Sequence, residues 1–201
     1  MTVRIPQQKR SIDKYETILR TTIRIINEDR FLNTSTHTIA KEARVGIGTV
    51  YDYFDSKEDI LMAALDLEIN SVWNQIEEMV TGLGEMDATE LMNLILQFMV
   101  NHAYQNIGFV KIAFGYIPGV LESDTMAKNL VHLESLLKSL LLKSGPNASF
   151  EEIDSKVFLI VNMLIGVMLG VSRGVPHTVS RESIIRELES VIGAFVQQGG
   201  K

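Results

Sequence analysis

The chain has 201 residues, of which 46% are hydrophobic and 22% are charged, and it contains no cysteine. This composition is typical of a globular protein and excludes disulfides and thiolate metal sites. The formal net charge is −6, but residues 1–57 hold ten Lys/Arg against seven Asp/Glu, while residues 58–201 hold nine against eighteen. A basic N-terminal part beside an acidic remainder is typical of a nucleic-acid-binding module attached to a separate body. A solvated charged face gives the same asymmetry.

The N-terminal region contains no apolar run in its first 30 residues, so we expect no signal peptide and a cytoplasmic protein. Helical spacing of apolar residues predicts a helix at 13–29 and shorter helices at 36–43 and 47–53. Ser35 is expected to cap the second of these, because its hydroxyl can accept a hydrogen bond from an exposed backbone N–H. Three helices are therefore predicted at the start of the chain.

The rest of the chain is also predicted to be helical, because no stretch shows the alternation and hairpin turns of strands. Gly82, Asp87, Ser149 and Gly174 supply start and stop signals. The further predicted helices, each with its capping residues, cover 56–81, 87–106, 109–117, 123–143, 149–174 and 181–197. The fold is therefore expected to be all-α, with about nine helices.

The helices at 36–43 and 47–53 are joined by about three residues, which is the spacing of a helix-turn-helix module. In such a module the second helix lies in the major groove of DNA. Four apolar side chains are expected to face its interior: Ile39, Ala40, Val50 and Phe54. The outward face of the second helix is then formed by Gly48, Thr49, Tyr51, Asp52 and Tyr53.

This outward face carries groups that suit DNA. Gly48 allows a close approach of the backbone, and Thr49 can offer a hydroxyl or a methyl group to a base. Tyr51 and Tyr53 carry rigid phenols that suit phosphate oxygens. Lys57 adds a positive charge at the start of the next helix, where a phosphate is favoured. The alternative, that the two tyrosines are half-buried core residues, is disfavoured by the combination at this spacing.

The stretch TSTHTIAKEARVGIGTVYDYFDSKEDIL, residues 34–61, resembles the DNA-binding head of the tetracycline-repressor (TetR/AcrR) family. The residues that match the family pattern are Thr34, Ser35, Ile39, Ala40, Ala43, Val45, Gly48, Thr49, Val50, Tyr51, Phe54, Ser56, Lys57 and Glu58. The resemblance covers about residues 14–62. It implies a DNA-binding helix-turn-helix domain at 1–57 and a helical bundle for ligand binding and dimerisation at 58–201. The expected DNA-contacting residues are Thr34, Ser35, Arg44, Gly48, Thr49, Tyr51, Asp52, Tyr53 and Lys57.

Several positions depart from the family pattern. Arg30 and Arg44 stand where the family usually has glycine, and both are predicted to need a left-handed or strained backbone, which costs arginine about 1 kcal/mol or more. Gly46 replaces the usual serine cap of the second short helix. Asp52 could accept from cytosine N4 or point away from DNA.

The remainder of the chain shows no catalytic motif, and its four histidines lack metal-ligand spacing, so we expect neither an enzyme nor a metal or cofactor. Large apolar side chains are frequent and suit either an ordinary core or an adaptable pocket. The resemblance implies a pocket for a small, apolar effector. The candidate lining residues are Trp73, Phe98, Met99, His102, Phe109, Phe114, Tyr116 and Met163.

The last two helices are expected to join two copies of the chain. The apolar stretch 157–171 has 15 residues and is interrupted by Asn162, whereas a membrane span needs about 20, so we expect no membrane partner. Its Gly166 and Gly170 would let two helices approach closely. Two copies of this helix and of the following one could form a four-helix interface across a two-fold axis.

The expected function is that of a ligand-responsive transcriptional regulator. It is expected to be a repressor that binds a near-palindromic DNA operator as a homodimer and is released by a small, apolar effector. The alternative is a helical ligand-binding or scaffold protein with a degenerate head that no longer binds DNA.

Overall fold

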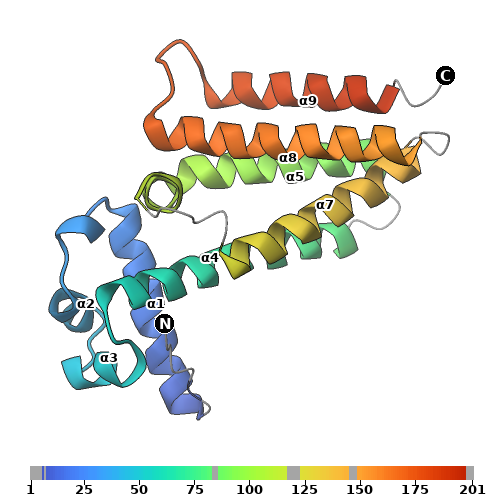
Figure 1. The fold of residues 1–201 in the computed structure, drawn as a ribbon. Helices are drawn as coiled ribbons and strands as arrows, with labels where there is room; N and C mark the ends of the chain where they lie inside the picture. Colours follow the sequence, from blue (N-terminus) through green and yellow to red (C-terminus); the bar gives the residue numbers. More distant parts are fainter. Residues whose placement is uncertain (1–5, 7, 83–85, 117–122, 145–148, 198–201) are drawn as a thin grey trace. The chain divides into compact units, whose positions relative to one another are not determined.

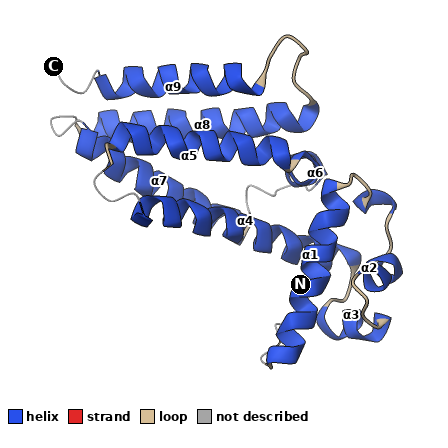
Figure 2. Ribbon diagram, turned by 180° about the vertical axis from the view of Figure 1, so that it is seen from behind, coloured by secondary structure: helices blue, strands red, loops and turns tan. Residues whose placement is uncertain are grey.

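A computed structural model describes residues 6, 8–82, 86–116, 123–144 and 149–197. Within these ranges the chain forms nine α-helices, a short 3₁₀ helix and a π-helical turn, and no strand (Figures 1 and 2). The predicted all-α fold is confirmed. The chain divides into two compact units, Met1–Ser71 and Val72–Lys201. The functional division at residue 57 stays a prediction.

The first unit follows the predicted helix-turn-helix arrangement. Its elements are α1 (Lys9–Asn27), η1 (Phe31–Asn33), α2 (Thr36–Glu42), α3 (Ile47–Tyr53) and the first part of α4 (Lys57–Gly82). The predicted bounds of α2 and α3 agree with the structure to within one residue. The 3₁₀ helix η1 was not predicted, because three residues are too short to show a periodic pattern.

The core of the first unit is formed by one face of α1 and the inner sides of α2, α3 and α4. The buried apolar residues from these four helices include Ile18, Leu19, Ile25, Ile26, Ile39, Ala40, Val50, Ile60 and Leu65. The four from α1 recur at helical spacing and therefore lie on one side of it. Burial of each large aliphatic side chain stabilises the fold by about 1.5–3 kcal/mol. The predicted interior positions of α2 and α3 are thus confirmed.

The second unit is a bundle around α5. It contains the rest of α4 and then α5 (Ala88–Gln105), α6 (Ile107–Lys111), the π-helical turn η2 (Ile112–Tyr116), α7 (Asp124–Ser144), α8 (Phe150–Arg173) and α9 (Arg181–Gln197). Helix α5 packs on α7, α8 and α9, and α6 packs on α8. One helix was predicted at 109–117, where the structure has α6 and η2 and where residue 117 lies outside the described ranges.

Capping residues set the bounds of these helices as predicted. Asp87 accepts from the backbone N–H of Thr89 at the start of α5. Ser149 and Glu152 form a capping box at the start of α8, in which each side chain accepts from the backbone N–H of the other residue. Gly174 ends α8 with a φ of 93°, which favours glycine.

Candidate nucleic-acid interface

The turn between α2 and α3 has the local geometry that the sequence predicts. Ser35 accepts a hydrogen bond from the Thr38 backbone N–H at 3.2 Å and caps α2. Arg44 is left-handed, with a φ of 56°, and it is exposed. Gly46 begins α3 without a side-chain cap. The turn therefore carries the predicted strain at Arg44, and its guanidinium lies at the surface.

The prediction for Arg30 was wrong. Arg30 has φ −108° and ψ −9°, which is an ordinary helical conformation. The left-handed residue is its neighbour Asp29, with a φ of 56°. Aspartate tolerates this conformation better than most residues, because its short polar side chain can bond locally. The left-handed residue of the turn after α1 therefore lies one position earlier than predicted, and the backbone of Arg30 is not strained.

The outward side of α3 is open. Gly48 and Asp52 are exposed, Tyr51 is 48% exposed, and Thr49 is partly exposed. A Cβ placed on Gly48 would meet no atom within 4 Å, so no described residue covers that point. The Tyr51 hydroxyl lies 3.3 Å from the Thr36 hydroxyl, which ties the start of α2 to this side of α3. These side chains and Ser35 are accessible to a partner.

Tyr53 is placed differently from Tyr51. It is half-buried, and its ring meets the edge of the Tyr15 ring at a centroid distance of 5.7 Å. Tyr15 in turn stacks on Phe54 at 5.1 Å. Burial, with the Asp66 carboxylate as a second cause, raises the pKa of the Tyr15 phenol. The Tyr53 ring therefore belongs partly to the core, as in the alternative that the sequence left open.

Thr34 and Lys57 are held within the first unit. Thr34 is 8% exposed, and its hydroxyl donates to the Arg30 carbonyl at 2.8 Å. The Lys57 ammonium donates to the carbonyls of Phe31, Leu32 and Thr34 at 3.3, 3.4 and 3.0 Å, and it lies 4.7 Å from the centre of the Phe31 ring. An ammonium has three N–H donors, so a phosphate would compete with these carbonyls for Lys57.

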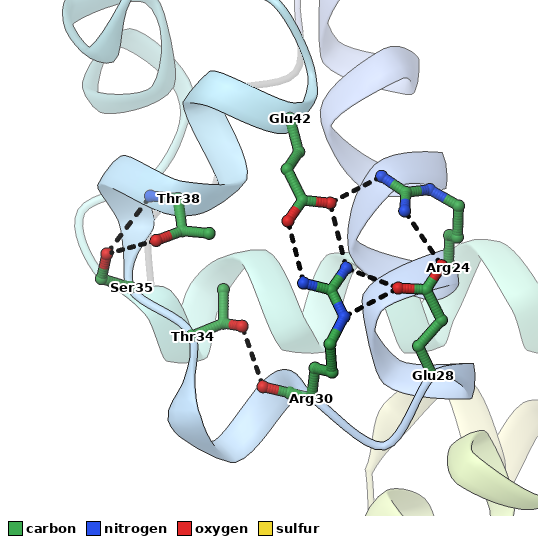
Figure 3. A network of polar contacts seen from close by, with 7 residues as sticks. All are labelled: Arg24, Glu28, Arg30, Thr34, Ser35, Thr38 and Glu42. Carbon is green, nitrogen blue, oxygen red and sulfur yellow. Dashed lines mark hydrogen bonds and ion pairs between the residues drawn. The ribbon is translucent and has the colours of Figure 1, made fainter.

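Sequence reasoning missed a ring of charged side chains between α1 and α2, formed by Arg24, Glu28, Arg30 and Glu42 (Figure 3). The two arginines hold the pKa of Glu42 at about 2, with Arg30 as the larger cause. The same two residues lower the pKa of Glu28. The i,i+4 spacing of Arg24 and Glu28 is the one part of this ring that the sequence signals.

The pKa of Glu42 gives a prediction on stability. A carboxyl whose folded pKa lies below its ordinary value of 4.5 stabilises the fold above that value, and this contribution is lost as the pH falls through about 2. Glu42→Gln should therefore be slightly less stable than the wild type at pH 7, because solvent screens these ion pairs, and the difference should shrink between pH 4.5 and 2. Urea unfolding midpoints across this window measure it. A constant difference down to pH 2.5 would show that the Glu42 charge does not stabilise the fold.

Five of the eight predicted effector residues pack against two apolar clusters of the second unit. Phe98, Met99, Met163 and Trp73 pack against the main apolar cluster, which includes residues of α5, α7, α8 and α9. Phe114 packs against a smaller cluster of Ala103, Val110, Met168 and Val171.

The remaining predicted effector residues are His102, Phe109 and Tyr116. His102 lies beside Phe98, with ring centroids 5.8 Å apart, while Phe109 is buried and Tyr116 is exposed. The structure therefore brings some of the eight together without gathering all of them around one point.

Two polar atoms that the sequence did not signal lie inside the second unit. The Tyr104 hydroxyl and the Asn93 side-chain oxygen are buried without a hydrogen-bond partner in the described part of the chain. Tyr104 contacts both apolar clusters, and burial raises the pKa of its phenol. A buried polar atom without a partner is destabilising by about 1–3 kcal/mol, so a polar group of a ligand could offset this.

Helix α8 has one buried and one exposed apolar side. Phe158 is 65% exposed and Leu159 is 47% exposed, whereas Val157, Ile160 and Leu164 are buried. The helix has 24 residues and contains an 18-residue window of mean hydropathy 1.9, of which 28% is buried. By length and composition it could cross a membrane, a test that core helices of soluble proteins also pass. The apolar run of 15 residues at 157–171 lies within this helix, whose bounds agree with the predicted 149–174 including caps.

Comparisons with known proteins agree with this geometry. The family model described as bacterial regulatory proteins, tetR family, matches residues 18–64. The chain is 25% identical over 162 residues to the HTH-type transcriptional regulator SAR0097 of Staphylococcus aureus, covering 78% of this chain and 81% of the relative. It is 35% identical over 72 residues to the fatty acid metabolism regulator protein of Bacillus subtilis, covering 36% of each.

A solved structure shows that the likeness in fold extends beyond the matched segment. A transcriptional regulator of the TetR/AcrR family from Thermobifida fusca superposes with a TM-score of 0.68 at 16% identity, covering 90% of this chain and 96% of that one. The relatives are transcriptional regulators, which confirms the prediction of a regulator rather than an enzyme. Residues 18–64 therefore match the tetR family of bacterial regulatory proteins, and over most of its length the chain has the same fold as the TetR/AcrR regulator.

Proposed function

We propose that the protein is a ligand-responsive repressor, which binds a near-palindromic DNA operator as a homodimer and is released by a small, apolar effector. The observation that carries the proposal is the open side of α3, where Gly48 and Tyr51 are exposed on a helix-turn-helix. The proposal assigns DNA binding to residues 1–57, and effector binding and dimerisation to residues 58–201. It places the protein in the cytoplasm without a membrane partner.

The proposed DNA contacts fall into two kinds. Tyr51, Ser35 and Arg44 are exposed hydroxyl and guanidinium groups that suit phosphate oxygens, which fix the register of the protein on the duplex. Thr49 and Asp52 lie on the same helix as Gly48 and suit base edges in the major groove. Thr34, Tyr53 and Lys57 support this surface from within, through the Arg30 carbonyl, the Tyr15 ring and the carbonyls of Phe31, Leu32 and Thr34.

The exposed side of α8 supports the proposed homodimer. Figures 1 and 2 show α5 and α8 side by side and nearly parallel, and α8 also packs on α6 and α7. Phe158 and Leu159 lie exposed on this helix. An apolar side of this kind marks an interaction site, and a two-fold axis would pair it with its own copy.

The two apolar clusters of the second unit support an apolar effector. Tyr104 and Asn93 would give such a molecule a polar anchor, because each has a buried atom without a partner in the described residues. An effector that binds one arrangement of the dimer better than the other would change the spacing of the two α3 helices and release the operator. Fatty acids are the first compounds to test, because one relative is named for fatty acid metabolism.

Selection of bound fragments from random duplex DNA, followed by titration of salt and of fatty acids, tests the proposal. A near-palindromic site should emerge. Its affinity should fall by about 10³–10⁵ between 50 and 200 mM salt if 6–10 phosphates are contacted. A medium- or long-chain fatty acid should release the DNA. No preference for any duplex at low salt would instead favour a ligand-binding protein with a head that does not bind DNA.

A further inference from the structure

The ring of Arg24, Glu28, Arg30 and Glu42 links α1 to α2 through directional hydrogen bonds (Figure 3). The Glu42 carboxylate, at the last residue of α2, accepts from both terminal nitrogens of Arg30, at 3.0 and 3.1 Å. It also accepts from Nη2 of Arg24 in α1, at 2.7 Å. A carboxylate that accepts from a guanidinium fork in this way is fixed in angle as well as in distance.

Glu28 closes the ring on the other side. Its carboxylate accepts from Nη1 of Arg24 at 3.0 Å and from Nε of Arg30 at 2.8 Å. Two guanidinium groups therefore alternate with two carboxylates around the ring. The end of α1, the turn that contains Asp29 and the end of α2 are linked by one network.

This ring contributes more to the relative orientation of α1 and α2 than to the stability of the fold. The side chains of Arg24, Glu28 and Arg30 are 41–51% exposed, and that of Glu42 is 24% exposed. Ion pairs at such positions contribute little to the free energy of unfolding. Glu28 and Glu42 also lie at the C-terminal ends of α1 and α2, where a negative charge is disfavoured by the helix dipole. Both carboxylates therefore bind the arginines at positions that the helix dipoles alone would disfavour.

The orientation of α2 governs that of α3. The two helices pack on each other, and the turn from Ala43 to Gly46 joins them directly after Glu42. The chain between α1 and α2 contains the left-handed Asp29 and the short η1, so no continuous helix sets the angle between α1 and α2. A tilt of α2 on α1 would tilt the exposed side of α3 by a similar angle.

We propose that Arg30 and Glu42, supported by Arg24 and Glu28, are positioning residues that set the angle at which the α2–α3 pair meets the operator, without contacting DNA themselves. The proposal rests on the proposed function. It also gives Arg30 a role at a position where the family pattern has glycine.

The test uses the full-length protein, its selected operator and a duplex of unrelated sequence. Arg30→Gln makes the first unit more acidic, and Glu42→Gln makes it more basic, so a bulk charge effect would change affinity for DNA in opposite directions. A positioning role instead predicts that each variant loses operator affinity. We expect a loss of about tenfold, because coupling between distant sites typically changes affinity by about 5- to 150-fold. The double variant should lose about as much as either single variant, because both remove the same network.

Arg20→Gln and Glu16→Gln are matched controls, because these two residues pair with each other within α1, at 3.5 Å, and do not link it to α2. Both should bind the operator like the wild type. The salt dependence of Arg30→Gln should equal that of the wild type, and its affinity for the unrelated duplex should be unchanged.

Three results would overturn the proposal. Tighter operator binding by Glu42→Gln would show a bulk charge effect, and a salt slope lowered by about 1 in Arg30→Gln would make Arg30 a phosphate contact. Unchanged operator affinity with a lower unfolding temperature would make the ring purely structural. If the wild type prefers no duplex, the proposed function fails instead.

Discussion

Tyr51→Ala is expected to abolish operator binding while the helix content and the homodimer remain intact. Tyr51 is 48% exposed on α3, so its removal leaves no cavity in the core and should change the free energy of unfolding by about 0.5 kcal/mol or less. A tyrosine at the centre of an interface contributes about 2–4 kcal/mol, which corresponds to roughly 30- to 700-fold in affinity. In the proposed homodimer this loss occurs in both subunits. Gel-shift titration and circular dichroism measure the two effects.

Two variants locate the source of the effect. Tyr51→Phe keeps the ring and removes the hydroxyl that lies 3.3 Å from Thr36, so it should show an intermediate loss of affinity. Leu32→Ala truncates an exposed side chain of η1 in the same unit and should bind the operator normally. Full operator affinity in Tyr51→Ala would show that Tyr51 does not contact DNA. The proposed interface on α3 would then lack its principal contact.

The parts of the fold that the sequence predicted best are those set by local signals. Helices α3 and α9 have the predicted bounds, and Ser35, Asp87 and Ser149 cap their helices as expected, because a cap depends on residues within one turn. The inward positions of α2 and α3 followed from helical spacing for the same reason. The exposure of Gly48 and Tyr51 was predicted on this basis.

The features that the sequence did not predict depend on residues far apart in the chain. Lys57 lies 23–26 residues from the carbonyls that surround its ammonium, and Arg30 lies 12 residues from Glu42. Nothing local indicates such partners. The left-handed backbone was assigned to Arg30 because the family pattern has glycine there, whereas the structure makes the turn at Asp29. A family pattern therefore fixed the place of the turn only to within one residue.

Phe158→Glu is expected to convert the proposed homodimer to a monomer at micromolar concentration and to abolish operator binding. Phe158 is 65% exposed on the uncovered side of α8, so the folded monomer should tolerate a carboxylate there. At a two-fold interface the substitution occurs twice, and each carboxylate would be buried without a partner. The dissociation constant should rise at least about 100-fold. Operator affinity should then fall as well, because the two half-sites are no longer engaged by one linked pair of heads.

Sedimentation velocity and gel-shift titration on the same samples measure both consequences, with Val131→Glu as the control. Val131 is 58% exposed on α7, so this variant adds the same charge to the same unit and should remain a homodimer. Wild-type chain that pelleted with lipid vesicles would point to lipid as the partner of α8, and a dimeric Phe158→Glu would place the interface elsewhere. A partner helix suits α8 better than lipid, because its other side already packs on α5, α6 and α7 and is closed to solvent. A helix covered on one side by protein has one apolar strip left to bury, and a second copy of the same strip matches it in shape and polarity.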